Sequence, residues 1–175
     1  MAKMTFGASN GNHGKWDVFT TMLSIEDLSE LLSKNVCAKG EEIWETDFYL
    51  GDVDSAPLQR KPTTARTEPL KRYVKSNIVG AEASYAGALP ALSVAVMGDV
   101  APASNGGVEI KWDNNFKAIL VDGMGRFTSL RDLYINEGLN LNVPVTFYTM
   151  EDLDEEGCRQ VLHDFNRYST TMRPV

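Results

Sequence analysis

The most constraining feature of the sequence is an apolar run that passes through two glycines directly into a helical pattern. Residues 118–121 read Ala-Ile-Leu-Val, the turn Asp122-Gly123-Met124-Gly125-Arg126 follows, and apolar residues then recur at helical spacing up to Glu137. A short apolar run bounded by glycine is typical of a buried strand, and the later spacing is typical of a helix packed on one face. A strand followed at once by a helix favours a mixed fold, α+β or α/β, and we expect α+β.

Strand and helix signals on either side of this junction complete the expected fold. Runs bounded by Gly, Pro and Asn predict three central strands, over 88–98, 108–112 and 116–123. An aromatic run at 43–50 and an alternating run at 143–149 predict two more. Helices are expected over 25–34, from near Thr67 with Pro69 in the first turn, over 126–137 with Gly138 as C-cap, and after the N-cap Asp154.

The domain organisation follows from where periodic patterns begin. The polar, Gly- and Asn-rich start predicts a flexible leader over 1–15, and residues 16–175 are expected to form one domain. A chain of 175 residues can hold a core without disulfides or a structural metal. Cys37 and Cys158 form no metal or redox motif, which favours the cytoplasm. No run has the length and apolarity of a signal peptide or membrane span, so no membrane partner is expected.

Charge is distributed unevenly along the chain. Seventeen basic against twenty-four acidic residues give a formal net charge of −7 at pH 7, which repels DNA and acidic membranes. Residues 58–77 have the opposite sign, with six basic side chains, one acidic one and a local charge of +5. A charge run on a helix is ordinarily a solvated face. Any contact with nucleic acid has to use a local patch such as this one.

The turn at 122–126 has the composition of an anion site. Its two glycines let the backbone approach a ligand, the amides of the helix start point outward, and Arg126 adds a guanidinium fork suited to phosphate. The alternative is a glycine-rich turn with no ligand. Asp122 either contacts a ribose, orients Arg126, helps to hold Mg²⁺, or simply caps the next helix, and the sequence leaves these alternatives open.

Three segments resemble, in order, the DGQHR-domain family of the ParB/sulfiredoxin-like superfamily. The junction VDGMGRFTSLRDLY, residues 121–134, is similar to its Asp-Gly-Gln-His-Arg signature. Upstream, Gln59-Arg60 and the helix that ends at Asn77 are similar to its Gln-Arg and Arg/Tyr helix. Downstream, residues 143–174 are similar to its closing strand and helix. The resemblance covers about residues 58–174 and implies a ParB/sulfiredoxin-like mixed sheet with flanking helices.

Within this superfamily the sequence is most similar to the DndB-like proteins, which are encoded beside bacterial enzymes of DNA phosphorothioation. The resemblance implies a regulator of transcription that binds DNA or a nucleotide phosphate and serves a DNA-modification or defence system, together with its modification proteins. Other members of the superfamily bind a nucleoside triphosphate at the loop that corresponds to 122–126, which implies such a nucleotide with Mg²⁺ as ligand. The DndB-like chains are longer, so residues 1–175 correspond to an N-terminal part or to a shortened relative.

The chain departs from the family signature at Met124-Gly125, which stand in place of Gln-His. Without the imidazole these positions supply no acid or base, so binding is expected more than hydrolysis and no catalytic residue is assigned. The expected phosphate-binding residues are Asp122, Gly123, Met124, Gly125 and Arg126, with Asn166 and Arg167 closing the pocket unless they only form a polar C-cap. The expected DNA-binding residues, unless their segment is only solvated, are Arg60, Lys61, Arg66 and Arg72.

Two other functions remain open from the sequence. One is an NTPase or nuclease that uses Asp122 and Arg126 around a metal-bound phosphate. The other is an interaction module whose nucleotide loop has decayed. His13 and His163 are isolated from other metal-ligating residue types, so no metal site of the protein's own is expected.

Overall fold

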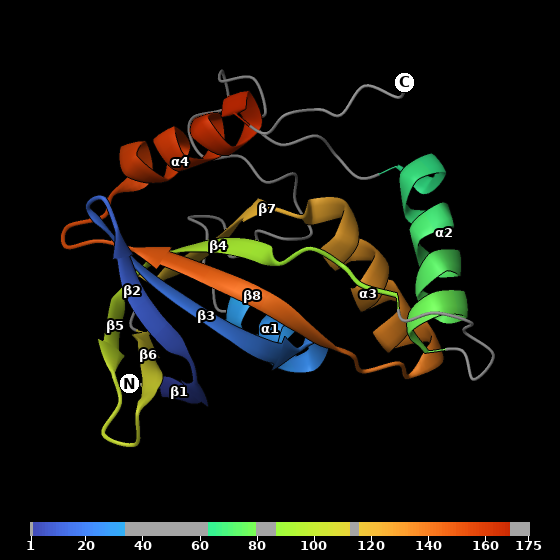
Figure 1. Cartoon of the computed structure of the whole chain (residues 1–175), viewed down its shortest axis with the longest axis horizontal. Helices are drawn as coiled ribbons and strands as arrows, with labels where there is room; N and C mark the ends of the chain where they lie inside the picture. The colour runs from blue at the N-terminus through green and yellow to red at the C-terminus, as the bar shows by residue number, and fades with distance from the viewer. Residues whose placement is uncertain (1, 34–62, 80–86, 113–115, 169–175) are drawn as a thin grey trace.

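The structure, a computed structural model, describes residues 2–33, 63–79, 87–112 and 116–168, which form an α+β fold built on two sheets (Figure 1). The larger sheet has the order β2-β3-β8-β4-β7. Only its β4–β8 pair is parallel among the described pairings, so the sheet is mixed. The smaller sheet is antiparallel, with the order β1-β6-β5. The strands are β1 (Ala2–Gly7), β2 (Ser9–His13), β3 (Trp16–Ser24), β4 (Leu92–Met97), β5 (Asp99–Pro102), β6 (Gly107–Trp112), β7 (Lys117–Asp122) and β8 (Asn142–Thr149).

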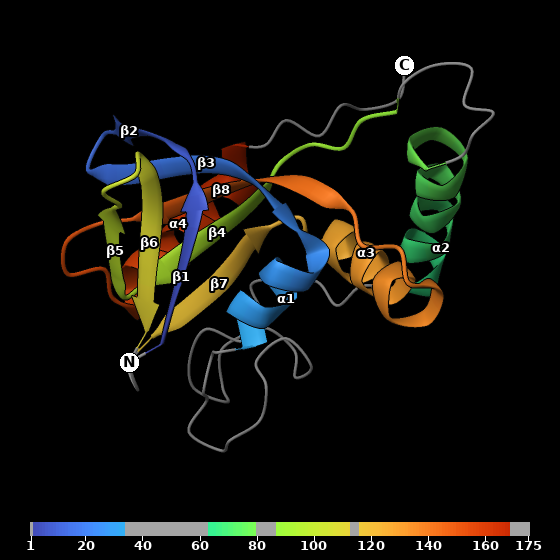
Figure 2. The ribbon, with the colours of Figure 1, turned by 90° about the horizontal axis from the view of Figure 1, so that it is seen from below.

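The two faces of the larger sheet are covered differently. One face meets the smaller sheet and α1 (Ile25–Ser33), as Figure 2 shows from below, and the main core lies between them. The rings of Phe6 and Phe147 meet there with centroids 5.4 Å apart. The other face is covered in part by α4 (Glu155–Tyr168), where Val161 packs against Ala95 and Ile119 in a second, smaller core.

Local capping residues set three helix boundaries as expected. The backbone N–H of Asp27 donates to Ser24 Oγ at 3.0 Å, which caps the start of α1. The long helix α3 (Met124–Glu137) ends at Gly138, whose φ of 70° places it in the left-handed region that glycine adopts without strain. Asp154 Oδ1 accepts from the amide of Gly157 at 2.8 Å at the start of α4. The predicted helices over 25–34, over 126–137 and after Asp154 are therefore confirmed.

The helix α2 (Thr64–Tyr73), which a π-helical turn η1 (Val74–Ile78) extends, runs parallel to α3. Three contacts advance together along both helices: Ser129 Oγ with the Thr67 carbonyl at 3.5 Å, Lys71 with Asp132 at 2.7 Å, and Lys75 with Glu137 at 2.8 Å. The two helix starts therefore lie at the same end of the pair. Both starts also lack a side-chain cap among the described residues.

One prediction about α2 was wrong in detail. The helix begins three residues before Thr67, so Pro69 lies inside it and not in its first turn. Proline has no N–H to donate to the carbonyl four residues earlier, which belongs to Ala65. Because Ala65 is exposed, water can satisfy that carbonyl, and the helix continues past the proline.

The expected polar leader over 1–15 is also corrected, because it contains β1 and β2. The strand β1 pairs with β6 from Ala2↔Trp112 to Gly7↔Gly107, and its Met4 and Phe6 pack against the main core. The strand β2 forms a hairpin with β3. Polar composition was misleading here because strand pairing satisfies the backbone whatever the exposed side chains are.

The three strands predicted between 88 and 123 exist, but only one of them is a central strand of the larger sheet. The strand β4 lies between β8 and β7, whereas β7 borders the sheet in the described residues and β6 belongs to the smaller sheet. An additional short strand, β5, follows β4 directly. The strand predicted over 143–149 is confirmed as β8. The strand predicted over 43–50 lies outside the described residues. No helix among those described is long and apolar enough to cross a membrane.

Candidate functional site

The start of α3 is shaped by a glycine that no other residue replaces easily. Gly123 has a φ of 98°, and a Cβ there would overlap the side chain of Leu92. The first helical hydrogen bond runs from the amide of Phe127 to the Gly123 carbonyl at 2.8 Å. The three amides between them have no partner in the described chain, as expected for an uncapped first turn. Successive free amides after a left-handed residue form a concavity that suits an anion.

Arg126 folds back over this turn and does not extend into solvent. Its Nη2 donates to the Ala91 carbonyl at 3.2 Å and to Asp122 Oδ2 at 3.0 Å. Its Nε–H is buried and has no acceptor among the residues that the structure describes. A buried donor without a partner costs about 1–3 kcal/mol, so it is a feature that needs an explanation such as a water molecule or an anion. Asp122 thus orients Arg126, and within the described residues the only hydrogen bond of its side chain is this one.

A row of polar side chains crosses the sheet and ends at Asp122. The strand register pairs Thr20 with Thr146 and Thr146 with Ser93. It also pairs Ser93 with Asp122, across a register shift that leaves Val121 without a partner in the β4–β7 register. Paired residues project on the same face. This is the α4 face, because Leu92 and Val94 on either side of Ser93 belong to the main core on the other face. We call Thr20, Thr146, Ser93 and Asp122 the polar row.

Ser93 is the notable member of the polar row. It is only 6% exposed, and its hydroxyl has no hydrogen-bond partner within the described residues. The two residues before Ser93 contact the start of α3: the Ala91 carbonyl accepts a hydrogen bond from Arg126, and the Leu92 side chain packs at Gly123. A largely buried hydroxyl that is paired in register with Asp122 is available to a ligand.

Aromatic rings lie on the same face, one row further along the sheet. Tyr148 makes edge-to-face contacts with Trp16 and Phe165, with ring centroids 6.4 and 5.5 Å apart. Burial raises the pKa of Tyr148, and the nearby negative charge of Asp122 raises it further. The contact with Phe165 also shows that the C-terminal half of α4 approaches the polar row.

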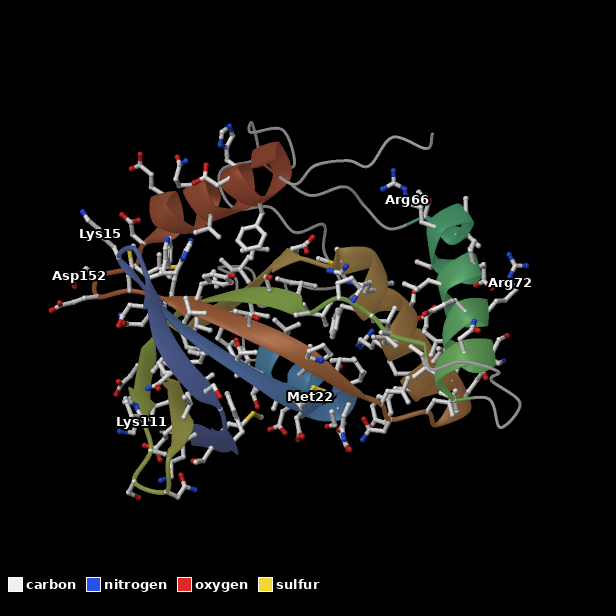
Figure 3. All side chains as sticks on the ribbon, viewed as in Figure 1. Lys15, Met22, Arg66, Arg72, Lys111 and Asp152 are labelled. Carbon is white, nitrogen blue, oxygen red and sulfur yellow. The ribbon has the colours of Figure 1, made fainter. Side chains whose placement is uncertain are left out.

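The basic segment divides into paired and unpaired cations. Lys71 contacts Glu68 at 3.0 Å and Asp132 at 2.7 Å, and Lys75 contacts Glu137. The carboxylates of Asp132 and Glu68 raise the pKa of Lys71 by accepting hydrogen bonds from it. By contrast, Arg66 and Arg72 are exposed and have no ion-pair partner in the part of the chain described (Figure 3).

Arg66 and Arg72 flank the outward side of α2. They are six residues apart, which places them about 120° apart around the helix axis. The exposed Ala65 and Pro69 lie between them, opposite the side that packs on α3. A strand of nucleic acid therefore has to cross this outward side of α2 for Arg66 and Arg72 to contact two of its phosphates.

The structure describes only some of the residues that the sequence predicts to bind phosphate or DNA. Asp122 and Arg126 are in contact, and Gly125 has open space where a Cβ would be. Met124 is partly buried against the main core, so only its amide remains for a ligand. The side chains of Asn166 and Arg167, and the whole of Arg60 and Lys61, lie outside what the structure describes.

Sequence reasoning missed Ser93, Thr146 and the Ala91 carbonyl. Ser93 and Thr146 interrupt apolar runs, but this signal alone does not bring them to Asp122. Only the pairing of β4 with β8 and with β7 does so. Among the described residues no three His, Cys, Asp or Glu side chains gather closely enough to hold a metal ion. Comparison with known proteins finds no match to a family model, a curated protein or a solved structure.

Proposed function

We propose that this chain recognises a phosphate, of a nucleotide or of DNA, at the start of α3. We further propose a ParB/sulfiredoxin-like fold and a cytoplasmic role as a DndB-like regulator of transcription in a bacterial DNA-modification or defence system. The resemblance of residues 58–174 to the DGQHR-domain family supports the biological role. The geometry at 122–126 supports the chemistry of the ligand.

The observation that carries the proposal is the buried Nε–H of Arg126 beside the three amides of the first turn, all without a partner in the described part of the chain. A phosphate oxygen satisfies both kinds of donor, and the positive end of a fourteen-residue helix favours its charge. Ser93 adds a hydroxyl without a partner on the adjacent strand. Mg²⁺ bound to the same phosphates would be held on the exposed side of Asp122, whose side chain is 54% exposed.

Binding is favoured over hydrolysis for a specific reason. Asp122, the carboxylate on which a hydrolase of this kind would depend, already accepts a hydrogen bond from Arg126. The guanidinium therefore occupies one oxygen of Asp122, which leaves that oxygen less available to accept a proton from an attacking water. The loop also has no other side chain that can exchange a proton near pH 7.

The proposal is tested by calorimetric titration of the full chain with inorganic phosphate, pyrophosphate and nucleoside triphosphates, with and without Mg²⁺. Arg126→Ala should weaken binding about ten- to hundredfold, since hydrogen bonds to a charged group contribute about 1.5–3 kcal/mol. Lys3→Ala is the matched control, because it removes one positive charge from the smaller sheet, where Lys3 pairs with Glu109. It should leave the affinity nearly unchanged.

Two results contradict the proposal. If no phosphate ligand binds to the native chain, the interaction module with a decayed loop is the better account. If Mg²⁺-dependent hydrolysis is rapid and disappears in Asp122→Ala while binding persists, the chain is an enzyme and Asp122 acts in its chemistry.

A further inference from the structure

A cavity of about 400 Å³ lies away from the start of α3, between the β2–β3 hairpin and the strand β5. Asn10, Asn12, Asp17 and Phe19 line it from the hairpin. The register pairs Asn10 with Phe19 and Asn12 with Asp17, so all four project on one face. That face meets the smaller sheet, because Phe19 belongs to the main core together with Val108 and Ile110. Val100 and Pro102 of β5 form the opposite wall.

The polar side of this cavity offers several free hydrogen-bond acceptors beside the N–H groups of its two asparagines. Asn12 Nδ2 donates to Asp17 Oδ1 at 2.5 Å, which leaves the other oxygen of Asp17 and the amide oxygen of Asn12 available. Asn10 makes no side-chain hydrogen bond in the described part of the molecule. The cavity therefore offers at least three oxygen acceptors, one of which carries a charge.

The carboxylate of Asp17 has no cation of the protein beside it among the residues described. Lys111 on the smaller sheet contacts Glu109 at 3.2 Å and Asp99 at 3.9 Å. Figure 3 shows Lys15 on the α4 side of the hairpin tip, and Lys111 below on the smaller sheet. Asp17 thus carries an uncompensated charge at the rim of a cavity whose other wall is apolar.

We propose that this cavity binds an alkylammonium group. An ammonium ion has three donors and no acceptor, which matches the free oxygens that Asp17, Asn12 and Asn10 bring to the cavity. A guanidinium fits less well, because it binds both oxygens of a carboxylate and one of them already accepts from Asn12. The methylene chain of the ligand packs on Phe19, Val100 and Pro102. The formal net charge of −7 attracts cations of this kind.

Two sources supply this chemistry, a free aliphatic diamine and the lysine side chain of a peptide. The experiment is a calorimetric titration of the full chain with 1,5-diaminopentane and, separately, with N-acetyl-lysine amide. The neutral 1-pentanol is the ligand control. The amines should bind and the alcohol should not. The amine that binds more tightly identifies the source, and either result supports the proposal.

Three variants test the assignment. Asp17→Asn should weaken amine binding about tenfold, while Glu156→Gln, which removes an exposed charge on α4, should change it less than about twofold. Asn10→Trp keeps the charge but fills the cavity from an exposed strand position, so it should abolish binding while circular dichroism stays unchanged. Equal weakening by the Asp17 and Glu156 variants, undiminished binding to Asn10→Trp, or no amine binding to the native chain would each overturn the proposal.

Discussion

The helices α2 and α3 pack against each other, yet they use their arginines in opposite ways. Arg126 is held against the Ala91 carbonyl and Asp122, and its Nε–H is buried. Arg66 and Arg72 are exposed and unpaired within the described residues. A guanidinium held by its own chain can shape a specific contact, whereas a free one mainly attracts charge over a distance. The start of α3 therefore suits a phosphate enclosed by the turn, whereas the outward side of α2 suits phosphates that lie on the protein surface.

The largest expected effect is a difference in folding stability between substitutions at the two glycines of the α3 start. Gly123→Ala should destabilise the fold by about 2–4 kcal/mol, because it adds the strain of a left-handed backbone to an overlap with Leu92. Gly125→Ala meets open space inside the helix, so it should stabilise by about 0.5–1 kcal/mol. Urea denaturation of both variants measures the difference. Similar effects of the two substitutions would show that Gly123 is not required by the turn.

This contrast also shows what the sequence could and could not reveal about the site. The turn was predictable because its five residues are consecutive, and each of them has a local conformational or charge preference. The sequence did not distinguish the two glycines, because the overlap at Gly123 involves Leu92 on another strand. The polar row escaped prediction for the same reason, since its four members come from four strands.

The second prediction compares the outward and inward cations of α2 in binding duplex DNA. If Arg66 and Arg72 contact phosphates, replacing both by Ala should flatten the slope of log affinity against log salt by nearly two units, about 0.9 for each lost contact. The pair Lys71→Ala and Lys75→Ala removes the same charge but should leave the slope nearly unchanged, because carboxylates already pair these lysines. Salt titrations by fluorescence anisotropy provide the slopes.

Two outcomes would contradict the assignment of Arg66 and Arg72 as DNA contacts. If the two double variants flatten the slope equally, the segment acts only through its net charge. If the native chain binds no duplex at low salt, Arg66 and Arg72 belong to a solvated face. Phosphate contacts position a protein without reading bases, so all DNA sequences should weaken alike.

The parts of the fold that depend on residues close in the sequence were predictable, and the parts that depend on distant residues were not. Helix boundaries at Ser24, Gly138 and Asp154 follow from capping within a few residues, and the structure has them there. The strand β1 was not found because its stability depends on pairing with β6, far along the chain, and on the packing of Phe6 against Phe147. Assignment of strands to two separate sheets is likewise a property of long-range pairing.

A smaller effect is expected at the ion pairs that join the two helices. Lys71→Ala should destabilise by about 1 kcal/mol, the upper end for a surface pair, because two carboxylates share this lysine. Lys75→Ala should cost less, about 0.3 kcal/mol, since Lys75 and Glu137 are both about half exposed. Thermal denaturation at low and high salt compares them. A larger effect at Lys75 would mean that the carboxyl ends of the helices, and not the middle, hold the pair together.

The smallest effect concerns Tyr148, beside the polar row, and it appears only at alkaline pH. Burial, and secondly the charge of Asp122, raise the pKa of Tyr148 in the folded chain. A tyrosine whose folded pKa exceeds its unfolded value of about 10 contributes stability that is fully present below that pH and is lost as the pH rises through the folded pKa. Tyr148→Phe should match the native chain at pH 8 and lose less stability above about pH 10.

Urea denaturation at both pH values measures this difference, and comparison with the native chain cancels the contributions of the other tyrosines. Asp122→Asn should recover only the minor part of the alkaline loss, because burial is the larger cause. If Asp122→Asn recovers as much as Tyr148→Phe does, the charge of Asp122 dominates the environment of the polar row. A phosphate bound beside Asp122 would add a second negative charge there, so ligand should make the alkaline loss of stability at Tyr148 steeper.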